Sequence, residues 1–85
     1  MNCVYVLFSD RKKRTYVGVT GNPRFRLGFH NQGLVPSTNY GRPWRILVEI
    51  WFDTQTAALD FERYLKSGSG KAFMYRHFIS SFARP

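Results

Sequence analysis

The chain has 85 residues and a single cysteine, Cys3, which predicts one domain over residues 1–85 and excludes an intramolecular disulfide. Hydrophobic residues make up 44% of the chain and aromatic residues 18%, so even a short chain can bury a core. The net charge of +8 favours a polyanionic partner, above all nucleic acid. No apolar run approaches the ~20 residues that span a bilayer. Without a signal peptide or membrane attachment, a cytoplasmic location is the expectation.

The first two apolar segments predict a β-hairpin. Residues 3–8 are apolar throughout, which is typical of a strand that is buried on both faces. A polar turn follows, and residues 15–20 are then rich in β-branched and aromatic side chains. Because the connection is short, the two strands are expected to pair in an antiparallel arrangement.

A helix is predicted over residues 23–31. Asn22 supplies its N-cap, and a proline occupies the first helical position. Phe25 and Phe29 are four residues apart and are expected to form its apolar stripe. Gly28 costs a helix interior about 1 kcal/mol relative to alanine, which suggests close packing at that position.

The next segments predict a loop and a third strand. Residues 34–43 hold two prolines, a glycine and an asparagine and are typical of a loop. Residues 44–52 alternate between an apolar set and a mixed set, which predicts a strand with one face in the core. The expected core set is Ile46, Val48, Ile50 and Phe52.

The last part of the chain predicts one long helix and a further short one. Asp53 is the expected N-cap of a helix over residues 54–67, and Gly68 and Gly70 are expected to end it. Its buried face is predicted to hold Ala58, Phe61 and Leu65. A final helix that packs on the sheet is expected to use Phe73, Phe78, Ile79 and Phe82.

These elements follow the order strand, strand, helix, strand, helix and a final helix. Short hairpin-type connections favour antiparallel pairing over parallel crossovers. The predicted fold is therefore a small α/β (α+β) sandwich, in which a three-stranded antiparallel sheet is flanked by helices.

Two cationic residues on the first helix are candidates for phosphate chemistry. Arg26 and His30 are four residues apart, so their side chains share one face of the helix. A guanidinium suits a phosphoryl oxygen, and an imidazole beside it can handle a proton. The alternative is a pair of solvated residues on the helix surface.

Glu62 lies on the face of the second long helix that also carries its apolar residues. A carboxylate there is costly to desolvate unless it is paired or binds a metal. One interpretation is an ion pair with Lys66, one helical turn later. The other is a hard oxygen ligand for Mg²⁺, an ion that takes one or two carboxylates and keeps several waters.

Tyr5 and Tyr16 belong to the two neighbouring strands of the hairpin. Buried strand tyrosines commonly serve as core residues with one polar handle. A phenol has a pKa near 10 and acts as a base only when a cation stabilises the phenolate or its proton is passed onward.

Together these segments resemble the GIY-YIG endonuclease domain in its short, stand-alone form. Val4-Tyr5-Val6 stands at the first motif of that family, and Tyr16-Val17-Gly18 closely matches the second. The arginine and histidine four residues apart are similar to the helix signature of the family. The helix around Glu62 and the segment Leu65–Phe73 continue the match, which runs from about residue 3 to residue 76.

The resemblance implies a nuclease that cuts DNA phosphodiester bonds with one divalent ion, Mg²⁺ or Mn²⁺. By position, Glu62 holds the metal and Arg26 stabilises charge on the phosphate. Tyr16 is the leading candidate to activate the attacking water, with Tyr5 assisting, and His30 supports proton transfer. Structured or damaged DNA, and a role in DNA repair, are the expected context.

A second hypothesis remains open from the sequence. The same basic and aromatic chain suits a non-catalytic nucleic-acid-binding module that has kept the nuclease fold. Because the chain holds only the nuclease core, a homodimer or a protein partner is expected in either case.

Overall fold

The sheet of the protein has three antiparallel strands in the order β2-β1-β3, in a computed structural model that describes residues 2–79. This architecture confirms the predicted α+β fold. The elements are β1 (Cys3–Ser9), β2 (Arg14–Thr20), α1 (Pro23–Asn31), the 3₁₀ helix η1 (Pro36–Gly41), β3 (Trp44–Trp51), α2 (Gln55–Leu65), α3 (Gly68–Met74) and the π-helical turn η2 (Tyr75–Ile79). None of the helices within residues 2–79 is long and apolar enough to cross a membrane.

β1 lies in the middle of the sheet, and every residue in it is buried. Its uninterrupted apolar run is what allows it to be covered on both faces. Tyr5 pairs directly with Gly18 on β2 and with Glu49 on β3. Because direct cross-strand partners project from the same face, these three residues share one side of the sheet.

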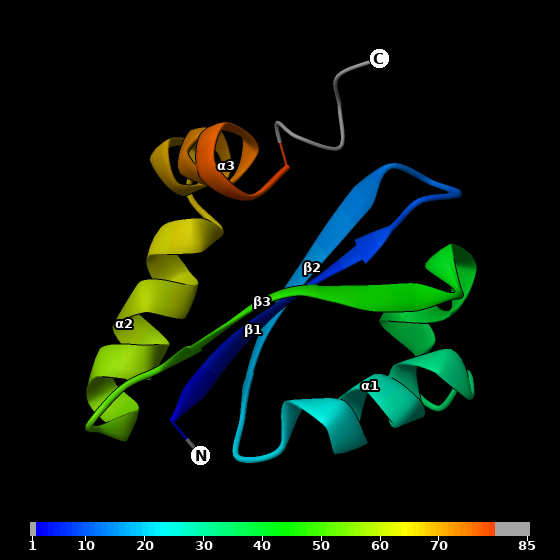
Figure 1. Cartoon of the computed structure of the whole chain (residues 1–85), viewed down its shortest axis with the longest axis horizontal. Helices are drawn as coiled ribbons and strands as arrows, with labels where there is room; N and C mark the ends of the chain where they lie inside the picture. The colour runs from blue at the N-terminus through cyan, green and yellow to red at the C-terminus, as the bar shows by residue number, and fades with distance from the viewer. Residues whose placement is uncertain (1, 80–85) are drawn as a thin grey trace.

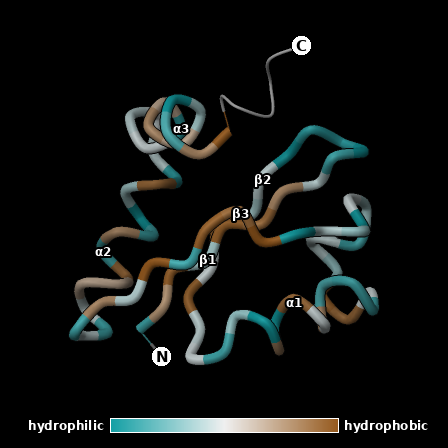
Figure 2. The backbone as a smooth tube through the Cα atoms, in the orientation of Figure 1, coloured by the Kyte–Doolittle hydropathy of each residue, from teal (hydrophilic) through white to brown (hydrophobic). Residues whose placement is uncertain are grey.

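The two faces of the sheet carry separate hydrophobic clusters. Val4 and Val6 face α2 and α3, whereas Cys3 and Leu7 face α1 together with Trp44. Figure 1 shows α1 on one side of the sheet and α2 with α3 on the other. In Figure 2 the apolar residues concentrate along β1 and β3 at the centre, and the turn between β1 and β2 is hydrophilic. Cys3 is fully buried in this core, and burial raises the pKa of its thiol, with Glu49 adding to the effect.

The strict alternation expected for β3 is wrong. Val6 pairs with Val48, but the next residue, Leu7, pairs with Ile46. A bulge therefore leaves Leu47 as the extra residue, and it shifts the side-chain alternation of β3 at this point. As a result Ile46 packs in the cluster on the α1 side, while Leu47 and Val48 pack in the other cluster.

The helix starts follow local capping. The Asn22 side chain accepts a hydrogen bond from the backbone N–H of Phe25 at 3.2 Å, which confirms the predicted start of α1. For α2 the expected cap, Asp53, is wrong by one residue. The Thr54 hydroxyl accepts from the backbone N–H of Ala57 at 3.1 Å, and the helix begins at Gln55.

The buried face of α1 differs from the expected stripe. Phe25 is 61% exposed, and its ring packs against that of Phe29, with ring centroids 4.8 Å apart. Leu27 and the fully buried His30 face the sheet instead. The close packing expected at Gly28 is also absent, because a Cβ there would meet no atom within 4 Å among the described residues.

Gly68 and Gly70 begin α3 rather than simply ending α2. The Ser67 hydroxyl accepts a hydrogen bond from the N–H of Gly70 at 3.1 Å and caps the new helix. A Cβ on Gly70 would collide with the carbonyl oxygen of Tyr64 and with Leu65. This position therefore requires glycine because α3 turns back tightly onto α2. Phe73, Phe78 and Ile79 pack onto the core as expected, and Phe82 lies outside the described residues.

Two alanine substitutions separate these glycines. Gly28→Ala should raise the free energy of unfolding by about 0.5–1 kcal/mol, because it removes the helix penalty of glycine without a clash. Gly70→Ala should lower it by about 1–3 kcal/mol, because backbone atoms must move to accommodate the methyl group. Urea unfolding followed by circular dichroism measures both. Equal effects of the two variants would contradict the packing described here.

Candidate functional site

A chain of hydrogen bonds runs from the central strand through α1 to η1. The Tyr5 hydroxyl lies 3.0 Å from Nε2 of His30, and Nδ1 of His30 lies 2.8 Å from Oγ1 of Thr38. All three side chains are buried, with exposed fractions of 1%, 0% and 1%. They thus form a connected polar system within an otherwise apolar core.

The heavy-atom geometry assigns the protons in this chain. The Thr38 hydroxyl donates to the backbone carbonyl of Val35 at 3.2 Å. Since a hydroxyl has one proton, Oγ1 must accept from the Nδ1–H of His30. In neutral histidine Nε2 is then the acceptor, so the Tyr5 hydroxyl donates to it. Nε2 of the imidazole is therefore the atom toward which the Tyr5 proton is directed.

Burial and one nearby charge set the protonation states. Burial lowers the pKa of His30, and the positive charge of Arg26 lowers it further. Burial raises the pKa of Tyr5, whereas hydrogen bonding to Arg26 opposes that rise. Tyr16 raises the pKa of Tyr5 through charge repulsion and hydrogen bonding. At rest the histidine is neutral and the phenol is protonated, and Arg26 is the group that favours a phenolate.

Tyr16 stands over the same site. Its ring centroid lies 4.7 Å from that of His30 and 6.1 Å from that of Tyr5. Unlike Tyr5, it is only half-buried and so keeps a face open to solvent. Arg26 is also half-buried, with its guanidinium 5.6 Å from the ring centroid of Phe29. The structure therefore brings four of the five predicted residues together, and the alternative of two solvated surface cations is wrong for His30.

Gly18 leaves space for the central phenol. Tyr5 and Gly18 are direct cross-strand partners. A Cβ on Gly18 would lie 2.7 Å from the Tyr5 hydroxyl oxygen and 2.8 Å from its ring. The last residue of the Tyr16-Val17-Gly18 motif thus has a steric role, because any side chain there would displace Tyr5 from His30.

Glu62 lies apart from these four residues, on α2. That helix packs on the other face of the sheet through Ala58 and Leu65. The carboxylate forms an ion pair with Lys66 at 3.1 Å, and its side chain is 22% exposed. The ion-pair interpretation of the sequence is therefore what the structure shows, and no hydrogen bond or ion pair joins Glu62 to Tyr5, Tyr16, Arg26 or His30 in the described part of the chain.

The donor set limits the kind of metal site that is possible. Within residues 2–79 no group of three or more His, Cys, Asp or Glu side chains is placed to hold an ion. A site built by the protein alone, as for structural zinc, does not fit. A single partly exposed carboxylate does fit Mg²⁺, which keeps waters and takes its other ligands from substrate phosphates.

Thr38 is the site residue that the sequence did not reveal. The segment 34–43 was expected to be a loop, but η1 forms within it and is held in place by Trp44. The Trp44 indole N–H donates to the carbonyl of Thr38 at 2.8 Å, and Asn31 bonds the backbone N–H and carbonyl of Trp44 at 2.7 and 3.0 Å. The sequence offered one signal for Thr38. A buried histidine has two ring nitrogens that both need a hydrogen-bond partner, so a polar side chain was required on the side of His30 away from Tyr5.

Comparisons with known proteins place the chain in a family. The family model described as the GIY-YIG catalytic domain matches residues 1–76 of the sequence. The chain therefore belongs to the GIY-YIG family. This confirms the resemblance that the motifs around Tyr5 and Tyr16 indicated. No solved structure matches the chain significantly.

The curated relatives are named as structure-specific endonuclease subunits. The chain is 38% identical over 89 aligned positions to subunit SLX1 of Candida dubliniensis, covering 95% of this chain and 29% of the relative. It is 43% identical over 68 positions to SLX1 of Podospora anserina, covering 71% and 19%, and 37% identical over 65 positions to the SLX1 homolog of Giardia intestinalis, covering 71% and 18%. The chain thus spans less than a third of the length of these relatives.

Thr38→Val tests the hydrogen-bond chain. Valine keeps the shape of threonine but leaves the Nδ1–H of His30 without an acceptor, so the free energy of unfolding should fall by about 1–3 kcal/mol. Thr38→Ser keeps the hydroxyl and should lose less. Nitrogen-15 shifts of the imidazole should report the Nδ1–H tautomer in the wild type and in the serine variant. An Nε2–H tautomer in the wild type would contradict the proton assignment.

The lowered pKa of His30 predicts a pH dependence of stability. An unfolded histidine takes up a proton near pH 6.5, whereas the buried native imidazole resists it to lower pH. The stability from neutral burial is complete above about pH 6.5 and declines as the pH falls, by at most about 1.4 kcal/mol per pH unit. Urea unfolding between pH 8 and pH 5 should show this decline, and His30→Gln should flatten it. An equal decline in both proteins would place the effect elsewhere.

Proposed function

We propose that the chain is the catalytic domain of a DNA endonuclease that hydrolyses phosphodiester bonds with one divalent ion, Mg²⁺ or Mn²⁺. The observation that carries the proposal is the buried chain from Tyr5 through His30 to Thr38, which lies beside Arg26. A purely structural core has little use for a phenol, an imidazole and a guanidinium that act on one another's pKa. The net charge of +8 supports a polyanionic substrate.

The geometry gives each tyrosine a role. Attack of water on phosphorus forms one P–O bond, breaks another and requires removal of a proton from the water. Tyr16 is the phenol open to solvent, so it is the one that can accept this proton. Tyr16 passes its own proton to Tyr5, and Tyr5 delivers its proton to Nε2 of His30. Exposure thus supports Tyr16 as the residue that faces the water and Tyr5 as its buried relay.

Arg26 and Glu62 act on charge. The guanidinium of Arg26 favours a phenolate at Tyr5 and binds a phosphoryl oxygen from the open side of the site. Glu62 would hold Mg²⁺ together with phosphate oxygens, and the bound ion supplies positive charge that stabilises the reacting phosphate and the leaving oxygen. The contact with Lys66 uses Oε2 of Glu62, so the other carboxylate oxygen is the one that would take the ion without loss of that contact.

The names of the relatives guide the choice of substrate and partner. Because they are named as subunits of structure-specific endonucleases, we propose branched or otherwise structured DNA as the substrate. The same names favour a protein partner over a homodimer, and light scattering of the purified chain separates a monomer from a dimer.

A non-catalytic nucleic-acid-binding module is the second candidate. The ion pair between Glu62 and Lys66 favours it, because the expected metal ligand is already satisfied within the chain. In that case binding to DNA would follow the basic surface and would not depend on the metal.

Cleavage of supercoiled plasmid and of a branched oligonucleotide decides between the two. Nicking is expected with Mg²⁺ or Mn²⁺ but not with EDTA. Glu62→Gln, Tyr16→Phe and Tyr5→Phe should each slow it by about 100-fold or more, the range of a lost acid–base group. Lys66→Ala is the matched control, since it breaks the same ion pair but frees the carboxylate and should keep or raise activity. Binding without cleavage of any substrate, or equal activity of Glu62→Gln and wild type, would overturn the nuclease proposal.

A further inference from the structure

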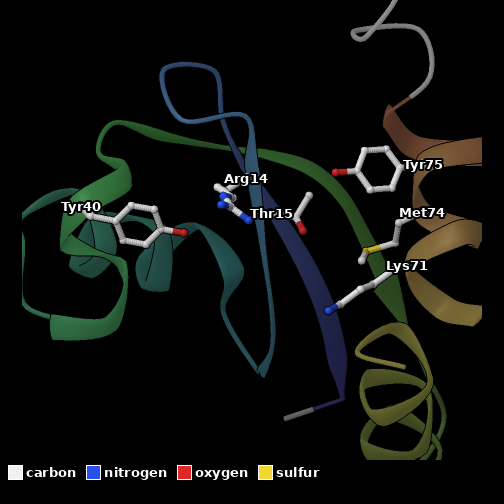
Figure 3. Close-up of a pocket in the computed structure, with 6 residues that line it drawn as sticks. All are labelled: Arg14, Thr15, Tyr40, Lys71, Met74 and Tyr75. Atoms are coloured by element: carbon white, nitrogen blue, oxygen red, sulfur yellow. The ribbon is translucent and has the colours of Figure 1, made fainter. Parts of the chain in front are cut away.

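A cavity of about 250 Å³ lies at the beginning of the edge strand β2, outside the group formed by Tyr5, Tyr16, Arg26 and His30. Its walls come from three parts of the fold. β2 contributes Arg14 and Thr15, and η1 contributes Tyr40. The remaining wall comes from α3 and the turn after it, with Lys71, Met74 and Tyr75. Figure 3 shows Tyr40 on one side of β2 and the residues of the α3 segment on the other, with their polar ends directed toward the strand.

The charges of this cavity favour an anion. Arg14 and Lys71 are two positive charges, and no acidic side chain lines the cavity. Within residues 2–79 neither the Arg14 guanidinium nor the Lys71 ammonium group forms a side-chain hydrogen bond or an ion pair, so both charges remain available. The Thr15 hydroxyl adds a neutral donor between them. Two free cations at the edge of a strand suit the phosphate of a nucleic-acid backbone.

The aromatic walls favour a base beside that phosphate. Tyr40 and Tyr75 are 48% and 57% exposed. Aromatic side chains bury large areas when they pack in a core, so these two rings leave much apolar surface in contact with solvent. Tyr40 is held in position, because its ring packs edge-on against Trp44 with centroids 5.9 Å apart and Arg11 donates to its backbone carbonyl. Exposed tyrosines next to cations are the pattern on which unpaired bases stack.

The position of the cavity connects it to the proposed reaction site. Thr15 lines the cavity, and the next residue on β2 is Tyr16. Neighbouring residues of a strand project to opposite faces, so the cavity and the tyrosine site lie around the same strand edge. A DNA strand that runs along this edge and places a phosphate near Tyr16 would bring a neighbouring nucleotide to the cavity.

We propose that this cavity binds an unpaired nucleotide of the DNA substrate, with its phosphate between Arg14 and Lys71 and its base against Tyr40 or Tyr75. The proposal rests on the proposed function, because it extends the same substrate by one subsite. It gives the domain a preference for DNA that has an unpaired nucleotide next to the cleaved bond, since a paired base cannot leave the stack to enter the cavity without a cost.

Fluorescence anisotropy in EDTA tests the subsite without cleavage. The probes are a labelled ten-nucleotide oligothymidine and a blunt duplex of the same length. Tyr40→Ser and Tyr75→Ser keep the charge, and the variant that removes the ring in contact with the base should weaken single-strand binding by about 5- to 100-fold, the range for one lost stacking contact. Binding of the duplex should change by less than about twofold relative to wild type. Arg14→Ala and Lys71→Ala should each reduce the salt slope of single-strand binding by about 0.7.

Arg63→Ala is the control, because it removes one exposed charge outside the cavity. Single-strand affinities of Tyr40→Ser and Tyr75→Ser equal to wild type would overturn the subsite while leaving cleavage intact. An equal loss of affinity for single strand and duplex in the tyrosine variants would overturn it as well. So would a reduction of the salt slope as large in Arg63→Ala as in Lys71→Ala. Failure of the wild type to bind any DNA would instead overturn the proposed function. A titration of wild type with trithymidylate followed by NMR needs no variant, and amide shifts confined to residues outside 14–15, 40 and 71–75 would also overturn the subsite.

Discussion

The hydrogen bond between the Tyr5 hydroxyl and His30 joins the central strand to α1, and the candidate site is arranged around it. It requires that β1 present Tyr5 toward α1, that β2 place a glycine opposite, and that α1 turn His30 inward. A polar group buried without a partner destabilises a fold, so the imidazole also needs Thr38 on its other nitrogen. Residues from β1, α1 and η1 are thereby fixed relative to one another by a few directional bonds.

The two faces of the sheet differ in the residues that they bury, since one face is apolar and the other also holds the polar side chains of the candidate site. The cluster on the α2 side is almost wholly apolar and holds α2 and α3 against the sheet. The cluster on the α1 side is smaller, and the polar system of Tyr5, His30 and Thr38 lies on the same side of the sheet. Because the clusters lie on opposite faces of the sheet, the α1 side can hold buried polar groups. The α2 side meanwhile supplies most of the apolar burial that stabilises so small a domain.

The edge strand β2 connects the two sites. Tyr16 faces the α1 side, and Thr15 belongs to the cavity lined by Arg14, Lys71 and the exposed tyrosines. An edge strand has one side without a neighbouring strand, which allows an extended polymer to approach it closely. Along that edge lie the cations Arg14 and Lys71 and the exposed tyrosine rings, and no acidic side chain lines the cavity. These groups are suited to a nucleic-acid chain that crosses the edge.

The sequence by itself determined the order of the elements, the hairpin and the cap of α1, because hydrophobic period, turn residues and capping are local properties. The resemblance of its motifs to a known family indicated the four side chains that meet in the site. Only the tertiary structure decided the depth of His30, the bulge at Leu47, the place of Gly70 and the part played by Thr38. Each of these depends on contacts between segments far apart in the chain, and local patterns carry no information on which distant group will satisfy a buried atom. The ion pair of Glu62 with Lys66 is the opposite case, because it joins residues four apart on one helix and was one of the two interpretations that the sequence offered.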